Sequence, residues 1–111
     1  MNYQSNETVK LQHLVDSIVE WSTATFGDRQ TTAIPVVHHL IKESNELIDA
    51  LESGFEFKEE FADCFMLLLE SANTCGISAK ELVDLTYAKL EKNKLRKWGA
   101  PDEHGVIEHV D

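Results

Sequence analysis

An uninterrupted apolar run is the feature that most constrains how this chain folds. Residues 64–69 read Cys-Phe-Met-Leu-Leu-Leu and lie inside a longer segment, 57–75, that contains neither proline nor glycine. In a helix of 3.6 residues per turn, such a run places apolar side chains on every side. A helix of this kind must be covered all round. We therefore predict a central helix, covered by its own chain and by a second copy.

Three further helices are predicted, and local signals mark their boundaries. Pro35 suits the first turn of one helix, and Ser78 with Glu81 forms a capping box that begins another. Gly27 and Gly54 mark breaks between helices. The predicted helices span residues 9–26, 35–52, 57–75 and 78–98, with a polar loop at 28–32 and a polar tail at 99–111. The fold class is therefore all-α: a single domain over residues 1–111, built as a four-to-five-helix bundle completed by homo-oligomerisation.

The balance of charge limits the classes of partner. Asp and Glu number 20 against 10 Lys and Arg, a formal net charge of −10. Nucleic-acid backbones are bound by basic surfaces, so this composition argues against a nucleic-acid partner. No segment resembles a signal peptide or reaches the ~20 apolar residues of a membrane span. We expect a cytoplasmic protein that binds no membrane.

Two pairs of carboxylates stand at i, i+3 spacing on neighbouring predicted helices. Glu43 and Glu46 form one pair, and Glu60 and Asp63 form the other. Each pair projects from one side of its helix, at a similar distance from the turn between the helices, so all four are expected to meet. Oxygen ligands without Cys or His suit Mg²⁺ or Mn²⁺. In so acidic a chain, paired carboxylates are also common as ordinary solvated residues, and spacing alone leaves both interpretations open.

A cationic stripe occupies the end of the last predicted helix. Half of the ten basic residues fall within 89–97, and Lys89, Lys92, Asn93 and Arg96 share an arc of about 100° on the helical projection. The helix dipole favours cations near a C-terminus, which explains the stripe without any ligand. Beside a metal site, the same stripe would neutralise a polyphosphate from the side opposite the metal.

The carboxylate pairs resemble the ExxE…ExxD signature of the MazG-like, all-α NTP pyrophosphohydrolase superfamily: Glu43-Ser-Asn-Glu46, thirteen residues, then Glu60-Phe-Ala-Asp63. Segment 89–98 resembles the K…N..R segment that follows it there. Other residues are similar to the dATP/dGTP diphosphohydrolase branch, which includes phage MazZ-like proteins. They are Trp21, Phe26-Gly27, Pro35, His39-Leu40, the KN..R.W ending, Asp102 and His109-Val110. The resemblance implies a MazG-like bundle over nearly the whole chain.

The resemblance also implies roles for the candidate residues. The metal-binding and catalytic set is Glu43, Glu46, Glu60 and Asp63, holding Mg²⁺, with Mn²⁺ possible, so that an activated water attacks the α-phosphorus and expels pyrophosphate. The phosphate-binding set is Lys89, Asn93, Arg96 and, as a weaker candidate, Lys92. The base or sugar pocket is Trp21, Phe26 and His39. A half-buried helix aromatic explains Trp21 at least as well, and a lone histidine beside an apolar face is more often structural than a ligand. Homodimers or dimers of dimers, with sites between subunits, are implied too.

Three functions stay open at this point. The first is hydrolysis of a purine deoxynucleoside triphosphate, dGTP favoured and dATP possible, to the monophosphate and pyrophosphate. The second is the same chemistry on dCTP, dUTP or a non-canonical nucleotide, since the metal signature does not select the base. The third is a non-enzymatic, dimeric helical interaction module, which leaves the carboxylates and the stripe unexplained.

Overall fold

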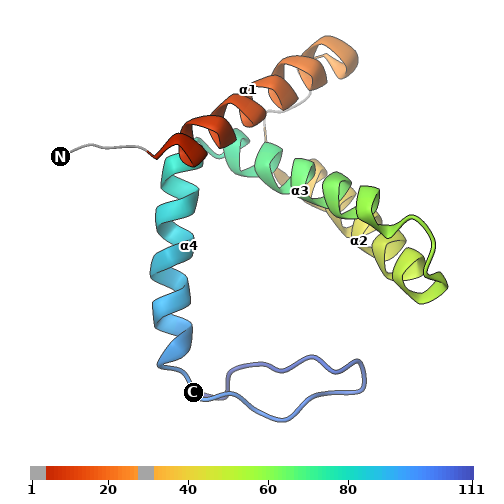
Figure 1. The fold of residues 1–111 in the computed structure, drawn as a ribbon, viewed down its shortest axis with the longest axis vertical. Coiled ribbons are helices and arrows are strands. Elements are labelled where there is room, and N and C mark those ends of the chain that lie inside the picture. The colour runs from red at the N-terminus through yellow and green to blue at the C-terminus, as the bar shows by residue number, and fades with distance from the viewer. Residues whose placement is uncertain (1–4, 28–31) are drawn as a thin grey trace.

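The computed structural model describes residues 5–27 and 32–111. In these ranges the chain forms α1 (Asn6–Phe26), α2 (Ile34–Ser53), α3 (Phe57–Thr74) and α4 (Ala79–Lys94), as Figure 1 shows. The predicted all-α class is confirmed. The loop predicted at 28–32 lies, except for Thr32, outside the described residues. None of the described helices is long and apolar enough to cross a membrane.

Hydroxyl caps begin α1 and α4. Ser5 Oγ accepts a hydrogen bond from the backbone N of Thr8 at 3.1 Å, so α1 starts at Asn6, earlier than the predicted residue 9. Ser78 Oγ accepts one from the backbone N of Glu81 at 3.2 Å. Each cap satisfies a donor that the first turn of a helix leaves free.

A tight turn makes α2 and α3 antiparallel neighbours, which pack against each other along the hairpin (Figure 1). Gly54 ends α2 at φ 72°, and its backbone N–H donates to the carbonyl of Ala50. Glycine adopts this left-handed conformation without the steric cost that a Cβ imposes. Glu56 takes the same region at φ 48° just before α3 begins. These residues reverse the chain and set which side of α2 faces α3.

The buried core lies where α1 packs on α3 and the start of α4. Its most buried members are Val15, Ile18, Leu69 and Ala79. Leu11, Val19, Met66 and Leu82 are partly buried and pack against it. The core therefore ties α1 to α3 and to the beginning of α4, and leaves the far end of α4 outside.

Beyond the core, α4 runs away from the α2–α3 hairpin (Figure 1). Within the described residues it contacts α1 and α3 but not α2. The radius of gyration is 16.4 Å, against about 13 Å for a compact chain of this length. On α3, Phe65 and Leu68 remain 47% and 48% exposed while Leu67 and Leu69 are buried. A single chain therefore covers only part of the helix that the sequence predicts to be covered all round.

The end of α4 differs from the prediction. The helix ends at Lys94, not at Trp98, because the following residues make other hydrogen bonds. The indole Nε1 of Trp98 donates to the carbonyl of Asn93 at 3.1 Å, which satisfies a group that the helix end leaves free. Arg96 lies past the helix, and its backbone N donates to the same carbonyl at 3.2 Å. That bond keeps Arg96 within a turn of Asn93.

The segment predicted as a polar tail is an ordered loop that closes on itself (Figure 1). Trp98 and His109 pair as an isolated antiparallel bridge, and the backbone N of Gly99 donates to the carbonyl of Glu108 at 2.9 Å. Near its tip, Asp102 Oδ1 accepts two backbone hydrogen bonds, at 2.8 and 2.9 Å. Bonds of this kind need no apolar periodicity, which is why pattern analysis did not predict the loop.

Candidate functional site

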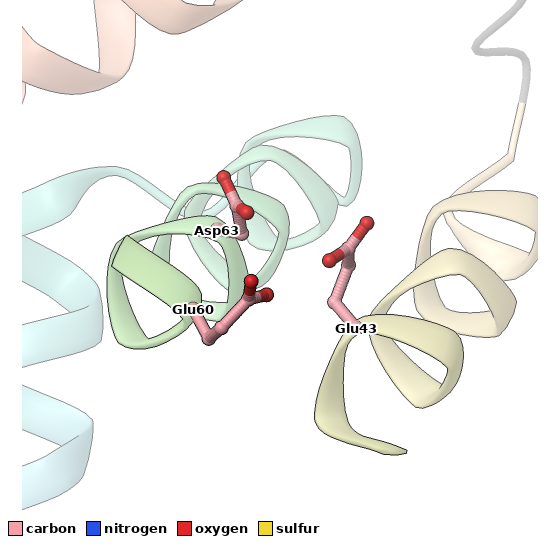
Figure 2. A group of neighbouring side chains, drawn as sticks. All are labelled: Glu43, Glu60 and Asp63. Atoms are coloured by element: carbon pink, nitrogen blue, oxygen red, sulfur yellow. The ribbon is translucent and has the colours of Figure 1, made fainter. Parts of the chain in front are cut away.

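Three carboxylates from two helices meet at the α2–α3 hairpin. Figure 2 shows Glu43 projecting from α2 toward Glu60 and Asp63 on α3. One oxygen of each lies within 4.8 Å of the others. Glu60 and Asp63 share a face because they stand at i, i+3, and the antiparallel packing brings Glu43 opposite them. Opposite oxygens around a Mg²⁺ ion lie about 4 Å apart, so the group has the scale of a cation site.

Crowding raises the pKa of Glu43. The largest cause is a hydrogen bond with the carboxyl of Glu46, followed by burial and by the charges of Glu46 and Asp63. Two carboxyl groups hydrogen-bond only by sharing a proton, so this contact favours the protonated form. His39 opposes the shift, since its Nε2 lies 3.2 Å from Glu43 Oε1. A negative cluster of this kind binds protons unless a cation takes their place.

The pKa of Glu60 is raised as well, by burial first and then by the charges of Glu46, Asp63 and Glu59. When the carboxylates are ionised they offer one another no proton. Oε2 of Glu60 and Oε2 of Glu43 are then buried with no hydrogen-bond partner among the described residues. Buried oxygens without donors are costly, and hard oxygen ligands suit Mg²⁺ or Mn²⁺. The residues present therefore fit a divalent cation.

Glu46 lies at the edge of this group. It is not among the residues whose oxygens lie within 4.8 Å of one another, although its charge raises the pKa of both Glu43 and Glu60. The sequence predicted that four carboxylates meet. The structure brings Glu43, Glu60 and Asp63 together and leaves Glu46 beside them.

A pocket of about 150 Å³ adjoins the carboxylates. It is lined by Trp21, Phe26, His39, Glu43, Asp63, Met66, Leu67 and Glu70. The rings of Trp21 and Phe26 meet edge to face with centroids 5.4 Å apart and are 53% and 49% exposed. Exposed aromatic faces are suited to stack on a planar base. The residues predicted for a base or sugar pocket thus lie together, next to two of the clustered carboxylates.

Glu70 is a pocket residue that the sequence reasoning missed. It is 4% exposed and accepts a hydrogen bond from Ser22 Oγ on α1 at 2.6 Å. A signal was available, because Glu70 is the one acidic residue between Asp63 and the end of α3, in an otherwise apolar or small stretch. Its spacing of i+7 from Asp63 puts both on the same side of the helix.

The cationic stripe is not brought to the carboxylates within one chain. Lys89 and Asn93 line a shallow groove on α4, and α4 makes no contact with α2 in the described residues. Asn93 Oδ1 is buried and has no hydrogen-bond partner there. Lys92 is exposed, and Arg96 is partly buried beyond the helix end. The acidic and cationic parts of the predicted site therefore stand on separate parts of a single copy.

This chain is similar to known proteins in both sequence and fold. The family profile for dATP/dGTP pyrophosphohydrolase matches residues 14–111. Among solved structures, the chain is similar to the MazG-like pyrophosphohydrolase of cyanophage S-2L, bound to dGDP and three catalytic Mn²⁺ ions per active site. That similarity has a TM-score of 0.70 at 26% identity and covers 89% of this chain and 95% of the other.

No curated protein sequence matches this chain. The profile match extends over both carboxylate pairs, the aromatic residues of the pocket and the stripe on α4. The MazG-like fold and the profile together favour an enzyme over a non-enzymatic interaction module. The chain belongs to the dATP/dGTP pyrophosphohydrolase family.

Proposed function

We propose that this protein hydrolyses a purine deoxynucleoside triphosphate, dGTP in preference to dATP, to the monophosphate and pyrophosphate. One observation carries the proposal: oxygens of Glu43, Glu60 and Asp63 lie within 4.8 Å of one another, directly beside a pocket lined by Trp21 and Phe26. The carboxylates suit the phosphate end of a nucleotide through a cation, and the aromatic rings suit its base. The cyanophage relative binds dGDP and Mn²⁺, which supports a deoxyguanosine nucleotide as the ligand.

The proposed cofactor is Mg²⁺, or Mn²⁺ in its place, held by Glu43, Glu46, Glu60 and Asp63. When bound, such a cation neutralises phosphate oxygens and lowers the pKa of a water that attacks the α-phosphorus. The chain contributes rigid ligands from two packed helices. His39 restrains one of them through its 3.2 Å contact with Glu43 Oε1, as partners of metal ligands commonly do.

The pocket suits the base rather than the whole nucleotide. Its volume of about 150 Å³ is below the roughly 300–1,000 Å³ of sites that enclose a complete ligand. Trp21 and Phe26 would stack on the purine. His39 would lie near the sugar, since it lines the same pocket and contacts Glu43. The triphosphate would then extend out of the pocket across the carboxylates.

We propose that a second copy supplies the phosphate-binding side chains. They are Lys89, Asn93, Arg96 and, with a lesser share, Lys92. One chain holds α4 away from the hairpin, whereas an oligomer can bring this stripe to the carboxylates of a neighbour. Cations on the side opposite the metal would stabilise the charge that develops as pyrophosphate leaves.

Two exposed apolar surfaces support the oligomer. The first, the α2 stripe, consists of Ile34, Val37, Ile41, Ile48 and Leu51, each between 42% and 67% exposed. Its spacing follows a heptad pattern, which is typical of helices that pair. The second is a groove of about 450 Å³ between α3 and α4, lined in part by Phe65, Leu68, Tyr87 and Leu90. Contiguous apolar surfaces of this kind mark interfaces.

The direct test is incubation of the purified protein with each dNTP and NTP, in Mg²⁺, in Mn²⁺ and in EDTA. The nucleotide product is identified by chromatography, and pyrophosphate by a coupled assay. Metal-dependent formation of dGMP or dAMP with pyrophosphate supports the proposal. Release of orthophosphate with a diphosphate means that a different bond is cleaved. Preference for dCTP or dUTP means that the purine assignment is wrong, and no turnover of any nucleotide contradicts hydrolysis itself.

A further inference from the structure

A buried carboxylate lines the pocket two helical turns along α3 from Asp63 of the metal-binding group. Glu70 is 4% exposed and lines the pocket together with Trp21 and Phe26. Burying an ionised carboxylate is costly unless it is hydrogen-bonded. Ser22 Oγ donates to its Oε1 at 2.6 Å, and an ionised carboxylate offers about four lone-pair sites. The N–H groups of a ligand in the pocket are donors of the kind that a carboxylate binds.

We propose that Glu70 binds the N1–H and 2-amino groups of guanine and so selects guanine over adenine nucleotides. This inference rests on the proposed hydrolysis and assigns its base preference to one side chain. Guanine presents two adjacent donors on its Watson–Crick edge, which match the two oxygens of a carboxylate. Adenine presents one donor and, at N1, a lone pair that a carboxylate repels. Charge-assisted hydrogen bonds are stronger than neutral ones, so the discrimination is large inside a water-poor pocket.

The placement of Glu70 along α3 fits the length of a nucleotide. Asp63 and Glu70 stand seven residues apart, two turns along one face, which separates their Cα atoms by about 10 Å. Met66 and Leu67 lie between them and form the apolar floor of the pocket. A nucleotide with its base against Glu70 and its sugar over this floor directs its α-phosphate toward Asp63.

A structural role for Glu70 makes a different prediction. If Glu70 only tethers α1 to α3 through Ser22, its removal disturbs the Trp21–Phe26 pair and lowers activity on every nucleotide by a similar factor. If it binds guanine, its removal changes the ratio between nucleotides. The ratio of kcat/KM for dGTP and dATP is therefore the quantity to measure, because a merely structural role does not move it.

Wild-type protein is tested first, with dGTP, dITP and dATP in Mg²⁺. Hypoxanthine keeps N1–H and lacks the 2-amino group, so dITP loses one hydrogen bond to Glu70. The expected order of kcat/KM is dGTP above dITP above dATP, with dITP reduced about 10-fold or more, the effect of losing one hydrogen bond to a charged group. A kcat/KM for dATP equal to or above that for dGTP overturns the inference without any variant.

Glu70→Gln is the matched variant, with nearly the same size and an NH₂ group, which carries two N–H donors, in place of one acceptor oxygen. The glutamine amide complements adenine, offering its oxygen to N6–H and its N–H to N1. We expect dGTP turnover to fall about 10- to 100-fold and dATP turnover to hold or rise. Ser22→Ala keeps the Glu70 carboxylate and is expected to affect both nucleotides alike. An unchanged ratio in Glu70→Gln, in protein whose circular dichroism shows it folded, overturns the inference.

Binding measurements separate this inference from the proposed hydrolysis. Calorimetric titration with dGMP and dAMP in Mg²⁺ reports base preference whether or not the protein turns over a triphosphate. Tighter binding of dGMP than dAMP by the wild type, and loss of that difference in Glu70→Gln, supports the role of Glu70 even if hydrolysis is absent. Hydrolysis of dGTP with equal binding of the two monophosphates retains the proposed function and contradicts the role of Glu70.

Discussion

The α2–α3 hairpin and α4 carry the two halves of the proposed site, and one chain assembles only the first. In the hairpin, Glu43, Glu60 and Asp63 converge within 4.8 Å. On α4, Lys89 and Asn93 face a shallow groove, and the helix makes no contact with α2 among the described residues. The acidic half is therefore complete in a single copy, and the cationic half stands apart from it.

The difference follows from how each half is connected. A short turn at Gly54 joins α2 to α3, so local chain geometry alone makes these helices antiparallel neighbours. The turn after α3 instead places the start of α4 against the core, and the rest of α4 runs away from the hairpin (Figure 1). We infer that metal binding depends on contacts within one chain, whereas phosphate binding depends on association.

Loss of a hairpin carboxylate should have the largest effect. Asp63→Ala removes one of the three clustered carboxylates. Since a bound cation stabilises the transition state by several kcal/mol, kcat/KM for dGTP should fall by about 10³-fold or more. Glu52→Ala, on α2 but outside the cluster, is the control and should retain wild-type turnover. Substantial metal-dependent activity in Asp63→Ala would show that the hairpin does not hold the catalytic metal.

Mixing two impaired variants tests whether the two halves of a site come from different copies. Arg96→Ala should lower kcat/KM about 10- to 100-fold through loss of a phosphate contact. When Arg96→Ala and Asp63→Ala subunits are mixed and allowed to exchange, hybrid dimers contain one intact site, and about a quarter of wild-type activity should return. Within-chain sites would give no recovery. The measurement is the hydrolysis rate before and after exchange, with each variant alone as reference.

A charged side chain introduced into the α2 stripe tests whether this surface is the oligomer interface. Ile41 lies in the middle of the stripe and is 54% exposed, so Ile41→Glu places a carboxylate at the centre of this surface. Burying an unpaired charge is unfavourable, so the oligomer should dissociate and activity should fall, while the helices persist by circular dichroism. Lys42→Glu, one residue along and outside the stripe, is the control. Light scattering after gel filtration gives the mass, and an unchanged mass for Ile41→Glu would place the interface elsewhere.

The contrast between the α2–α3 hairpin, which local geometry determines, and α4, which tertiary packing positions, also explains which parts of the molecule the sequence predicts. The i, i+3 spacing of Glu60 and Asp63 and the break at Gly54 are local features, and they fix the hairpin and most of its carboxylate group. The loop after α4 depends on the pairing of Trp98 with His109, which has no helical or alternating period to reveal it. The position of α4 relative to α2 depends on tertiary packing, which periodicity does not specify.

Errors within the predicted site have similar causes. Heights along two antiparallel axes predicted that all four carboxylates meet, whereas Glu46 lies outside the group formed by Glu43, Glu60 and Asp63. A shift of three residues changes the height by about 4.5 Å, which is within the freedom of two packed helices. Glu70 was missed because a charged residue in an apolar run does not by itself indicate a ligand site, and its meaning depends on the α1 residues packed against it.

Divalent metal should stabilise the hairpin in a pH-dependent way. The folded-state pKa values of Glu43 and Glu60 are raised above the ordinary 4.5. Without metal, the stability tied to their protonation is present below 4.5 and is lost as pH rises through the raised values. Mg²⁺ binds the ionised carboxylates, so the stabilisation that it gives increases as the pH rises. At 100-fold excess over Kd it should raise Tm by about 10 °C near neutral pH.

That rise should shrink as the pH falls toward the pKa values of the cluster. The measurement is Tm with Mg²⁺ and with EDTA, at several pH values. Asp63→Ala provides the control, since removal of a ligand should abolish most of the difference. A metal effect that stays constant across the acidic range would mean that the cation binds outside the Glu43–Glu60 group.

The smallest effect should come from the loop that closes the end of α4. Trp98→Phe keeps an aromatic ring and removes the indole Nε1 donor to the Asn93 carbonyl. Loss of that hydrogen bond costs about 1 kcal/mol and should lower Tm by about 5 °C. Trp21→Phe is the counterpart in the pocket: it should leave Tm nearly unchanged and raise KM for dGTP, because Trp21 stands 53% exposed beside the base site. A different outcome is that Trp98→Phe raises KM as much as Trp21→Phe does and leaves Tm unchanged. The end of α4 would then belong to the nucleotide site of a neighbouring copy. The separation between α4 and the α2–α3 hairpin would exist only in the isolated chain.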